Sequence, residues 1–210
     1  FIIAWESVSD DGSKENVFVQ RFSADTNRIG DIQKINSFQI NEQKKPVISF
    51  LDNGNYVVCW QSDHVVAQDF NIYAQLFNEN GKVHKKEVRI NSQTTDNQIN
   101  PRVCNLSNGS FVIIWQSYFQ DDSGYGIFGQ LYDNNFNALG NQFQVNTSTV
   151  GDQIDPQITS VSSNDFIVIW KNNDIAKQGI YGQIFNKYCE KVDSEFKVNA
   201  YTKNTEKSIV

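Results

Sequence analysis

Four tryptophans recur at a constant interval of 55 residues, and this spacing limits the fold more than any other feature of the chain. They are Trp5, Trp60, Trp115 and Trp170. Two further series keep the interval, namely Pro46, Pro101 and Pro156, and Gln43, Gln98 and Gln153. A fixed period of this length is the signature of a repeat architecture. The spacing therefore predicts one repeat domain over residues 1–210, with copies at about 1–45, 46–100, 101–155 and 156–210.

Each copy contains four short segments with strand character and no useful helical periodicity. The first is an apolar run such as residues 111–115, which is typical of a strand buried on both faces. The second, such as residues 127–132, alternates bulky and small side chains, and the third, such as 143–146, indicates an outer strand. We expect the fourth to begin at the proline, as at Pro156, because the first residue of a strand can lack its donor.

Four consecutive antiparallel strands per copy predict an all-β fold. We expect a β-propeller, or a segment of one, built from four four-stranded repeats of about 55 residues. Turn sequences such as Asn108-Gly109 join the fourth segment to the next apolar run and favour tight hairpins. Two arrangements stay open. One is a closed four-bladed ring in which residues 208–210 join the first blade, and the other is a segment of a larger propeller or array.

Composition narrows the classes of partner. The chain has 24 acidic and 18 basic side chains and a net charge of -6, which disfavours nucleic acid and anionic lipid. No apolar stretch approaches the length of a membrane helix, so we expect no membrane insertion by this segment. The absence of Met and the strand-like start at residues 1–5 predict a fragment or a processed product.

Three cysteines, Cys59, Cys104 and Cys189, occupy different repeat positions, and an odd number cannot pair completely. Cys59 stands where other copies have Ala or Ile, so we interpret it as a small buried hydrophobe. A disulfide between Cys59 and Cys104 is the alternative.

Three sequence motifs resemble repeats of very large secreted and cell-surface proteins. They are Trp-Gln-Ser, Gly-Tyr-Gly-Ile-Phe-Gly-Gln-Leu-Tyr-Asp and Phe-Gln-Val-Asn, in this order. Such repeats are commonest in bacterial adhesin-like proteins, and the resemblance covers essentially the whole chain. It implies an extracellular, propeller-like array and carries over no catalytic residue.

Most motifs that suggest chemistry have a structural explanation. Gly124, Gly126 and Gly129 spell G-x-G-x-x-G, but a strand follows where a dinucleotide site needs a helix. His64 and His84 lie in polar loop sequence without a recurring counterpart, so they indicate neither zinc binding nor a nucleophile and its base. The tryptophans and the series Gln20, Gln75, Gln130 and Gln183 are expected in the core, the glutamines as hydrogen-bonded bridges.

Calcium is a weak possibility in the loops that follow the tryptophans. The candidate ligands are Asp10, Asp11, Asp121 and Asp122. No complete calcium-binding loop is present, so ordinary polar turns are the favoured interpretation, and we expect no other cofactor.

We expect the face formed by these loops and by the connections between copies to hold a partner. Its candidate residues are Asp63, His64, Asp69, Tyr118, Tyr125 and Lys177. Variation on a repeated framework is how such a surface acquires specificity. Three sequons make Asn105, Asn108 and Asn146 glycosylation candidates if the source is a eukaryote that secretes the protein.

Taken together, these features favour a non-catalytic, extracellular structural or adhesive module that mediates protein–protein contacts within a larger surface or filament protein. The alternative is a carbohydrate- or calcium-binding, lectin-like propeller with glycan as a partner. A propeller glycosidase would need paired carboxylates on one rim, and the sequence marks no such pair, so we expect no enzymatic activity.

Overall fold

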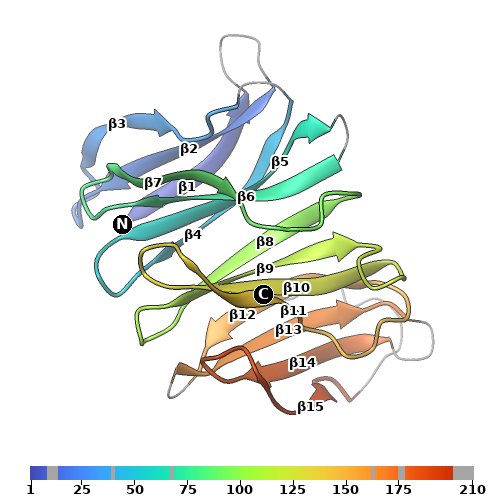
Figure 1. Ribbon diagram of the computed structural model, residues 1–210. Coiled ribbons are helices and arrows are strands. Elements are labelled where there is room, and N and C mark those ends of the chain that lie inside the picture. Colours follow the sequence, from blue (N-terminus) through green and yellow to red (C-terminus); the bar gives the residue numbers. More distant parts are fainter. Residues whose placement is uncertain (9–13, 39–40, 67–68, 162–163, 175–177, 201–210) are drawn as a thin grey trace.

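The computed structural model describes residues 1–8, 14–38, 41–66, 69–161, 164–174 and 178–200, except for the side chains of residues 64–66. These residues form fifteen β-strands and no α-helix (Figure 1). In chain order the strands are β1 (Ile2–Val8), β2 (Glu15–Phe22), β3 (Arg28–Lys34), β4 (Gln43–Phe50), β5 (Tyr56–Val66), β6 (Asp69–Phe77), β7 (Val83–Arg89), β8 (Gln98–Asn105), β9 (Phe111–Tyr118), β10 (Tyr125–Tyr132), β11 (Ala138–Gln144), β12 (Gln153–Ser160), β13 (Phe166–Asn172), β14 (Gly179–Phe185) and β15 (Lys191–Lys197). No helix in the described part of the chain has the length and apolar character that crossing a bilayer requires.

The strands form four sheets, and within each sheet the strands lie side by side in chain order. Three sheets have four strands, β4 to β7, β8 to β11 and β12 to β15, and the described part of the first sheet has three, β1 to β3. All strand pairs are antiparallel, so each sheet is a meander joined by hairpins. This is the arrangement of propeller blades, and the predicted all-β propeller fold is confirmed.

The tryptophan-bearing strands of the second to fourth blades lie in the interior, as the sequence predicts, whereas Trp5 on the partly exposed β1 is only half-buried. Every residue of β9 from Phe111 to Ser117 is buried. Trp60, Trp115 and Trp170 are fully buried, and each packs in the layer between its own blade and the preceding one. Three separate hydrophobic clusters fill the three blade boundaries, so the core is a series of layers rather than one centre.

In the second to fourth blades the innermost strand, β4, β8 or β12, begins three residues earlier than predicted. β8 begins at Gln98, and Pro101 lies inside it, where the pairing with β9 shifts register between Ile99 and Arg102. The residue before each proline has a left-handed backbone, with φ of 53° at Lys45 and 55° at Asn100 and Asp155. The proline is therefore tolerated at a β-bulge rather than at the start of a strand.

At each blade boundary, a side chain of the preceding blade accepts a hydrogen bond from the backbone N–H of the bulge residue. The backbone N–H of Asn100 donates to Gln61 Oε1 and that of Asp155 to Gln116 Oε1, both over 3.0 Å. Glu6 accepts the corresponding N–H of Lys45. The residue that follows the tryptophan in one blade thus fixes the innermost strand of the next blade.

The other glutamine series acts within a blade, which differs from the predicted bridge between blades or to a loop. The Nε2 atom of Gln130 donates to the carbonyls of Leu131, Leu139 and Gly140, at the bulge where β10 meets β11. Gln20 and Gln183 make the same three contacts in their blades. This side chain therefore holds the outer strand onto the blade.

The four sheets follow one another as a curved row (Figure 1). Each sheet packs on the next, through β1 on β4, β4 on β8 and β8 on β12. In the described residues the first and last sheets lie at opposite ends of this row. Residues 208–210, which join the first blade in the closed-ring alternative, lie outside the described residues.

Candidate functional site

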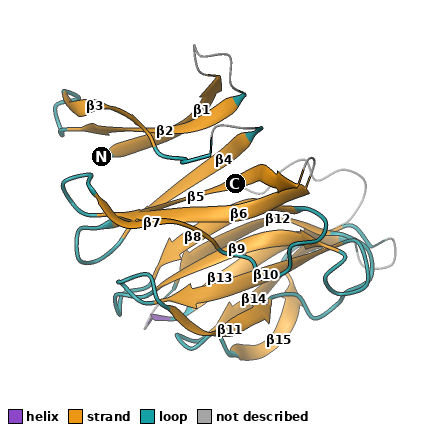
Figure 2. Cartoon of the chain, turned by 45° about the horizontal axis from the view of Figure 1, so that its top comes forward, coloured by secondary structure: helices purple, strands orange, loops and turns teal. Residues whose placement is uncertain are grey.

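In the second to fourth blades, the tryptophan-bearing strand ends and the innermost strand starts at one and the same end of the strands (Figure 2). The antiparallel order forces this, because β8 starts and β9 ends at the same end of its blade, where Gln98 pairs with Ser117. We call this end the loop face. It is where a site assembled from several blades can form.

The bulge residues of the innermost strands form a polar row near the loop face. Lys45 Nζ donates to Asn100 Oδ1, and Asn100 Nδ2 donates to Gln116 Oε1 over 2.6 Å. Asp155, the next member of the row, is exposed. The sequence analysis missed these residues, although their constant position directly before the repeated prolines was a signal that could have found them.

An aromatic cluster lies on the loop that joins β9 to β10. The rings of Tyr118 and Tyr125 lie edge to face with centroids 5.0 Å apart, and Phe119 lies 5.6 Å from Tyr118. Tyr118 is 38% exposed and Phe119 is 54% exposed. Exposed, mutually packed rings present an apolar surface with hydroxyl groups at its edge. Tyr118 and Tyr125 were predicted from the sequence, whereas Phe119 was not.

Asp121 lies in the same loop and is half-buried. Its Oδ2 atom accepts a hydrogen bond from Gln144 Nε2 over 2.7 Å, and its Oδ1 atom is buried without a partner in the described residues. Burial raises the pKa of this carboxyl above its ordinary value, and the charge of Asp122 adds to the effect. Asp121 therefore holds a proton at a pH where an exposed aspartate has lost it.

Two further carboxylates lie around the aromatic cluster. Asp152 Oδ1 accepts the backbone N–H of Tyr125 over 3.0 Å, which holds this carboxylate at the base of the loop. The charges of Asp152 and Asp96 contribute to the raised pKa of the Tyr125 hydroxyl, whose main cause is burial. The β9–β10 loop of the third blade and the connection to the fourth blade thus bring aromatic rings and carboxylates together, which the sequence did not indicate.

Two of the four calcium candidates, Asp121 and Asp122, lie within the described residues. Asp10 and Asp11 lie outside the described residues, and Asp122 is exposed beside Asp121. The described residues contain no group of three histidine, cysteine, aspartate or glutamate side chains that could hold a metal ion.

The predicted partner-face residues divide into three groups. Tyr118, Tyr125 and Asp69 lie at the loop face, where Asp69 begins β6. The prediction is wrong for Asp63, which does not lie on the exposed face. It is only 6% exposed, and its Oδ1 atom accepts the backbone N–H of Glu42, so it is part of the framework. Lys177 and the side chain of His64 lie outside the described residues.

The glycosylation candidates differ in their surroundings. Asn108 is exposed in the hairpin between β8 and β9, and Asn105 donates to Asp52 Oδ1 over 2.6 Å. Asn146 is 2% exposed, accepts the N–H of Ile127 through Oδ1 and donates to Gln153 through Nδ2. A glycan on Asn146 would break these bonds, so the structure argues against that candidate.

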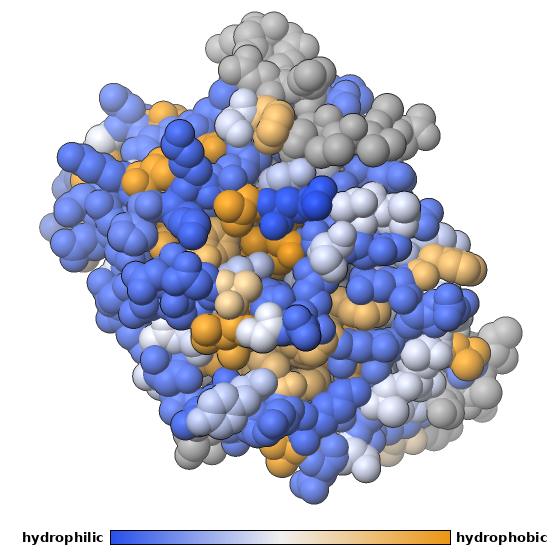
Figure 3. Space-filling view, in the orientation of Figure 1, coloured by the Kyte–Doolittle hydropathy of each residue, from blue (hydrophilic) through white to orange (hydrophobic). Residues whose placement is uncertain are grey.

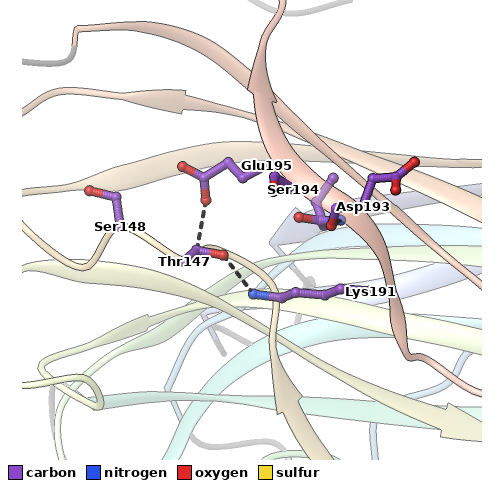
Figure 4. Close-up of a pocket in the computed structure, with 7 residues that line it drawn as sticks. Thr147, Ser148, Lys191, Asp193, Ser194 and Glu195 are labelled. Atoms are coloured by element: carbon purple, nitrogen blue, oxygen red, sulfur yellow. Dashed lines mark hydrogen bonds between the residues drawn. The ribbon is translucent and has the colours of Figure 1, made fainter.

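Two grooves lie on the outer rim of the blades, away from the aromatic cluster. The groove of about 440 Å³ in Figure 4 is lined by Thr147, Ser148, Gln183, Lys191, Asp193, Ser194 and Glu195. There Glu195 accepts the N–H of Thr147, and Lys191 Nζ donates to Thr147 Oγ1 (Figure 4). A repeat-related groove between the second and third blades contains the equivalent contact between Ser92 and Gln142. These grooves are a by-product of the contacts that join neighbouring blades.

The three cysteines are free in the structure. Cys59 and Cys104 are buried in two different blade layers, so the buried-hydrophobe interpretation of Cys59 is confirmed and the alternative disulfide is not formed. Burial raises the pKa of all three thiols, for Cys189 to about 12.

Neither a protein-family model nor a curated protein matches the chain. Solved structures do match. An α-L-arabinanase of Penicillium chrysogenum, complexed with arabinobiose, is 18% identical with a TM-score of 0.56, over 89% of this chain and 56% of its own. An α-L-arabinofuranosidase of Fusarium graminearum, complexed with an iminosugar inhibitor, is 11% identical with a TM-score of 0.57, over 86% of this chain and 55% of its own. A protein of unknown function from Dyadobacter fermentans is 12% identical with a TM-score of 0.62, over 87% of this chain and 50% of its own.

The chain spans about half the length of these three proteins. At such identities the likeness establishes the fold. The expectations of a non-catalytic adhesive module and of no enzymatic activity are nevertheless contradicted, because the matching propellers include arabinanases, arabinofuranosidases and a family-43 glycoside hydrolase. The physical reason for the error is that the rim residues come from loops without a repeat pattern, which the sequence could not place together. The resemblance to adhesin-like repeats stays a prediction.

Proposed function

We propose that the chain is a glycoside-hydrolase-like propeller that binds a pentose-containing glycan on its loop face and cleaves its glycosidic bonds. The observation that carries the proposal is the aromatic cluster of exposed Tyr118 and Phe119 with half-buried Tyr125, beside the half-buried Asp121 of the β9–β10 loop. Sugars offer an apolar C–H face and hydroxyl edges, which suit rings with polar tips at the edge.

Hydrolysis of a glycosidic bond uses one carboxyl group that donates a proton and a second that is ionised. Asp121 suits the first role, because burial raises its pKa and so keeps a proton available for the leaving oxygen. Asp152 suits the second role by position, because the N–H of Tyr125 holds its carboxylate beside the loop that carries Asp121. Both contact the loop that carries the aromatic cluster.

The substrate class comes from the fold neighbours, whose descriptions name an arabinanase and an arabinofuranosidase. Arabino-oligosaccharides are therefore the first substrates to offer, followed by xylo-oligosaccharides, since a xylanase shares the fold. A polymeric substrate of this kind agrees with the extracellular location expected from the sequence.

The test is to incubate the purified chain with these oligosaccharides and to separate the products by chromatography. We expect Asp121→Asn and Asp152→Asn to reduce cleavage by about 100-fold or more, the usual contribution of a general acid or base. Tyr118→Ala should raise KM more than it lowers kcat, because it removes binding surface rather than a proton donor. Asp25→Asn is the matched control, since Asp25 is exposed in the hairpin between β2 and β3 at the opposite end of its blade.

If both aspartate variants cleave as fast as the wild type, neither Asp121 nor Asp152 has the catalytic role assigned to it. Absence of cleavage and of binding with every pentose oligosaccharide would remove the proposal itself. Binding without cleavage would show that the loop face holds the glycan but that the catalytic assignment is wrong.

A further inference from the structure

One position of the repeat holds an asparagine in the first two blades and a glycine in the last two. The residues are Asn16, Asn71, Gly126 and Gly179, each paired with the residue two positions after its blade's tryptophan. Asn16 Oδ1 accepts Asn36 Nδ2 over 2.8 Å, and Asn71 Oδ1 accepts Asn91 Nδ2 over 2.7 Å. These asparagines are buried, so the pair belongs to the framework of the first two blades. A glycine at this position removes the acceptor and leaves a space that another side chain can fill.

The carboxyl group of Asp121 occupies the space beside Gly126. A Cβ atom on Gly126 would lie 2.6 Å from Asp121 Oδ2 and 3.1 Å from Asp121 Cγ. The same oxygen accepts Nδ2 of Asn146, the repeated asparagine of this blade, over 3.4 Å. A residue of the β9–β10 loop thus takes the place of a strand residue. We call this space, bounded by Gly126, Gln144 and Asn146, the Gly126 niche.

Gln144 on β11 has a basic counterpart in each of the other blades. The counterparts are Lys34, Arg89 and Lys197, which pair with the equivalent aromatic residue of the neighbouring strand. Gln144 instead donates from Nε2 to Asp121 Oδ2 over 2.7 Å. A positive charge at this range would favour the ionised carboxylate, whereas the amide supplies a hydrogen bond without that charge.

The fourth blade shows what fills the same space where the basic residue is kept. A Cβ atom on Gly179 would lie 2.6 Å from Lys197 Cε and 3.2 Å from Lys197 Nζ. The lysine of the outer strand therefore covers the glycine in that blade. In the third blade the shorter Gln144 leaves Gly126 to Asp121, so the combination of Gly126 with Gln144 admits the loop carboxyl group to the niche.

The niche fastens a loop that presents exposed aromatic rings. In the view of Figure 3, hydrophilic residues cover most of the surface and hydrophobic ones form separate patches. An exposed ring gains little from burial, so its position depends on how its loop is held. Phe119 and Asp122 have left-handed backbones, with φ of 58° and 67°, a conformation that persists only where surrounding contacts impose it. Asp121, between these two residues, supplies such a contact to β11.

We propose that Gly126 and Gln144 are positioning residues of the candidate site, because together they hold Asp121 and, through it, the loop of the aromatic cluster. Gly126 leaves the space, and Gln144 supplies the hydrogen bond. Side chains that act on a substrate need such a supporting layer to keep them in place. The effect on glycan cleavage rests on the proposed function, whereas the placement of the carboxyl group does not.

The test is the titration of the Asp121 carboxyl group, followed by NMR, with Asp121→Asn to assign the signal. Gly126→Asn restores the residue of the first two blades, whose side chain fills the niche and accepts Asn146 Nδ2. We expect the pKa of Asp121 to return to the ordinary value of 3.8 in this variant. Gln144→Lys restores a basic residue beside the carboxyl group and should lower the pKa of Asp121 below that value. The charge of Asp122 acts on Asp121 in the wild type and in both variants, so it does not produce these differences.

Cleavage of arabino-oligosaccharides gives the second readout. Gly126→Asn should lower kcat/KM by about 10-fold or more, because the carboxyl group leaves its place and the rings lose their support. Gln144→Lys should lower kcat more than it raises KM. The high-pH limb of its activity profile should move to lower pH, since an acid of lower pKa loses its proton earlier.

Asn71→Gly is the matched control, because it empties the equivalent position of the second blade. It should lower the melting temperature, since Asn91 loses an acceptor, and leave the titration of Asp121 and the cleavage rate unchanged. Gly126→Asn should keep the melting temperature of the wild type or raise it. A loss of cleavage in that variant is then not a loss of folding.

An Asp121 titration that is the same in the wild type and in Gly126→Asn overturns the proposal. So does full cleavage by a Gly126→Asn protein in which the pKa of Asp121 has fallen. Shifted titrations in a chain that cleaves no glycan support the placement of Asp121 by the niche and remove the proposed function.

Discussion

Gln116 Oε1 accepts the backbone N–H of Asp155 across the boundary between the third and fourth blades, over 3.0 Å. It also accepts Asn100 Nδ2 over 2.6 Å, and Gln116 is only 2% exposed. The bulge before Pro156 removes Asp155 from the strand ladder, so its N–H has no ladder partner. We expect Gln116→Leu to lower the free energy of unfolding by about 1–2 kcal/mol, because it leaves two part-buried donors without their acceptor. Urea denaturation measures this change.

Gln116→Glu is the matched control for this prediction, because Glu6 accepts the equivalent N–H at the first boundary. It should retain most of the stability that Gln116→Leu loses. Equal losses in both variants would mean that packing, rather than the hydrogen bond, holds the boundary.

Gly129 lies directly beneath Phe143, and a side chain at this position has no room. A Cβ atom on Gly129 would lie 2.7 Å from Phe143 Cζ and 3.1 Å from Ile114 Cγ2. We expect Gly129→Ala to destabilise the protein by about 1–3 kcal/mol, as overpacking does. Thermal unfolding followed by circular dichroism gives the size of the loss.

The second blade shows how this clash is avoided, since Ala74 there pairs with Val88 instead of a phenylalanine. The double change Gly129→Ala with Phe143→Val should therefore lose less than the sum of the two single changes. Strict additivity would indicate that the two side chains do not interfere.

Asp121 makes stability depend on pH in an identifiable direction. Burial raises its pKa in the folded state above the ordinary value of 3.8, so folding favours the protonated form. The stabilisation is present in full below pH 3.8 and is lost as the pH rises through the raised pKa. We expect the difference in melting temperature between the wild type and Asp121→Asn to change over this window and to stay constant above it. A difference independent of pH would show that Asp121 is ionised normally.

The thiols should be unreactive in the folded protein. Burial raises the pKa values of Cys59, Cys104 and Cys189, which removes the reactive thiolate at neutral pH. We expect iodoacetamide to modify all three in urea and to modify them far more slowly without it, as mass spectrometry can count. Rapid modification of Cys59 in the native protein would mean that its blade layer opens readily.

The fold could be predicted from the sequence because it depends on local and periodic information. The interval from Trp60 to Trp115 predicts the length of one blade. The apolar run that ends at each tryptophan predicts a buried strand, and Asn108-Gly109 predicts a hairpin turn. The start of the innermost strand was misplaced, since a proline inside a strand requires a bulge, and a bulge depends on an acceptor such as Gln116 in the neighbouring blade.

The aromatic cluster and the carboxylates around it could be predicted only in part, because their surroundings also depend on residues distant in sequence. Tyr118 and Tyr125 stood out because they vary where the framework does not. The environment of Asp121 depends on Gln144 and on burial beneath the loop, neither of which has a sequence pattern. Asp63 looked like a surface carboxylate in the sequence and is instead bonded to the backbone of Glu42.

The boundary between blades has a consequence for how a protein of this kind changes its size. Each boundary uses the same two parts. One is a stacked pair of aromatic rings of the later blade, and the other is an acceptor after the tryptophan of the earlier blade. A duplicated 55-residue unit inserted between two blades would therefore meet suitable neighbours on both sides from the start. Such a gene could gain or lose whole blades by unequal recombination, while selection acts separately on the loops that each new unit adds to the rim.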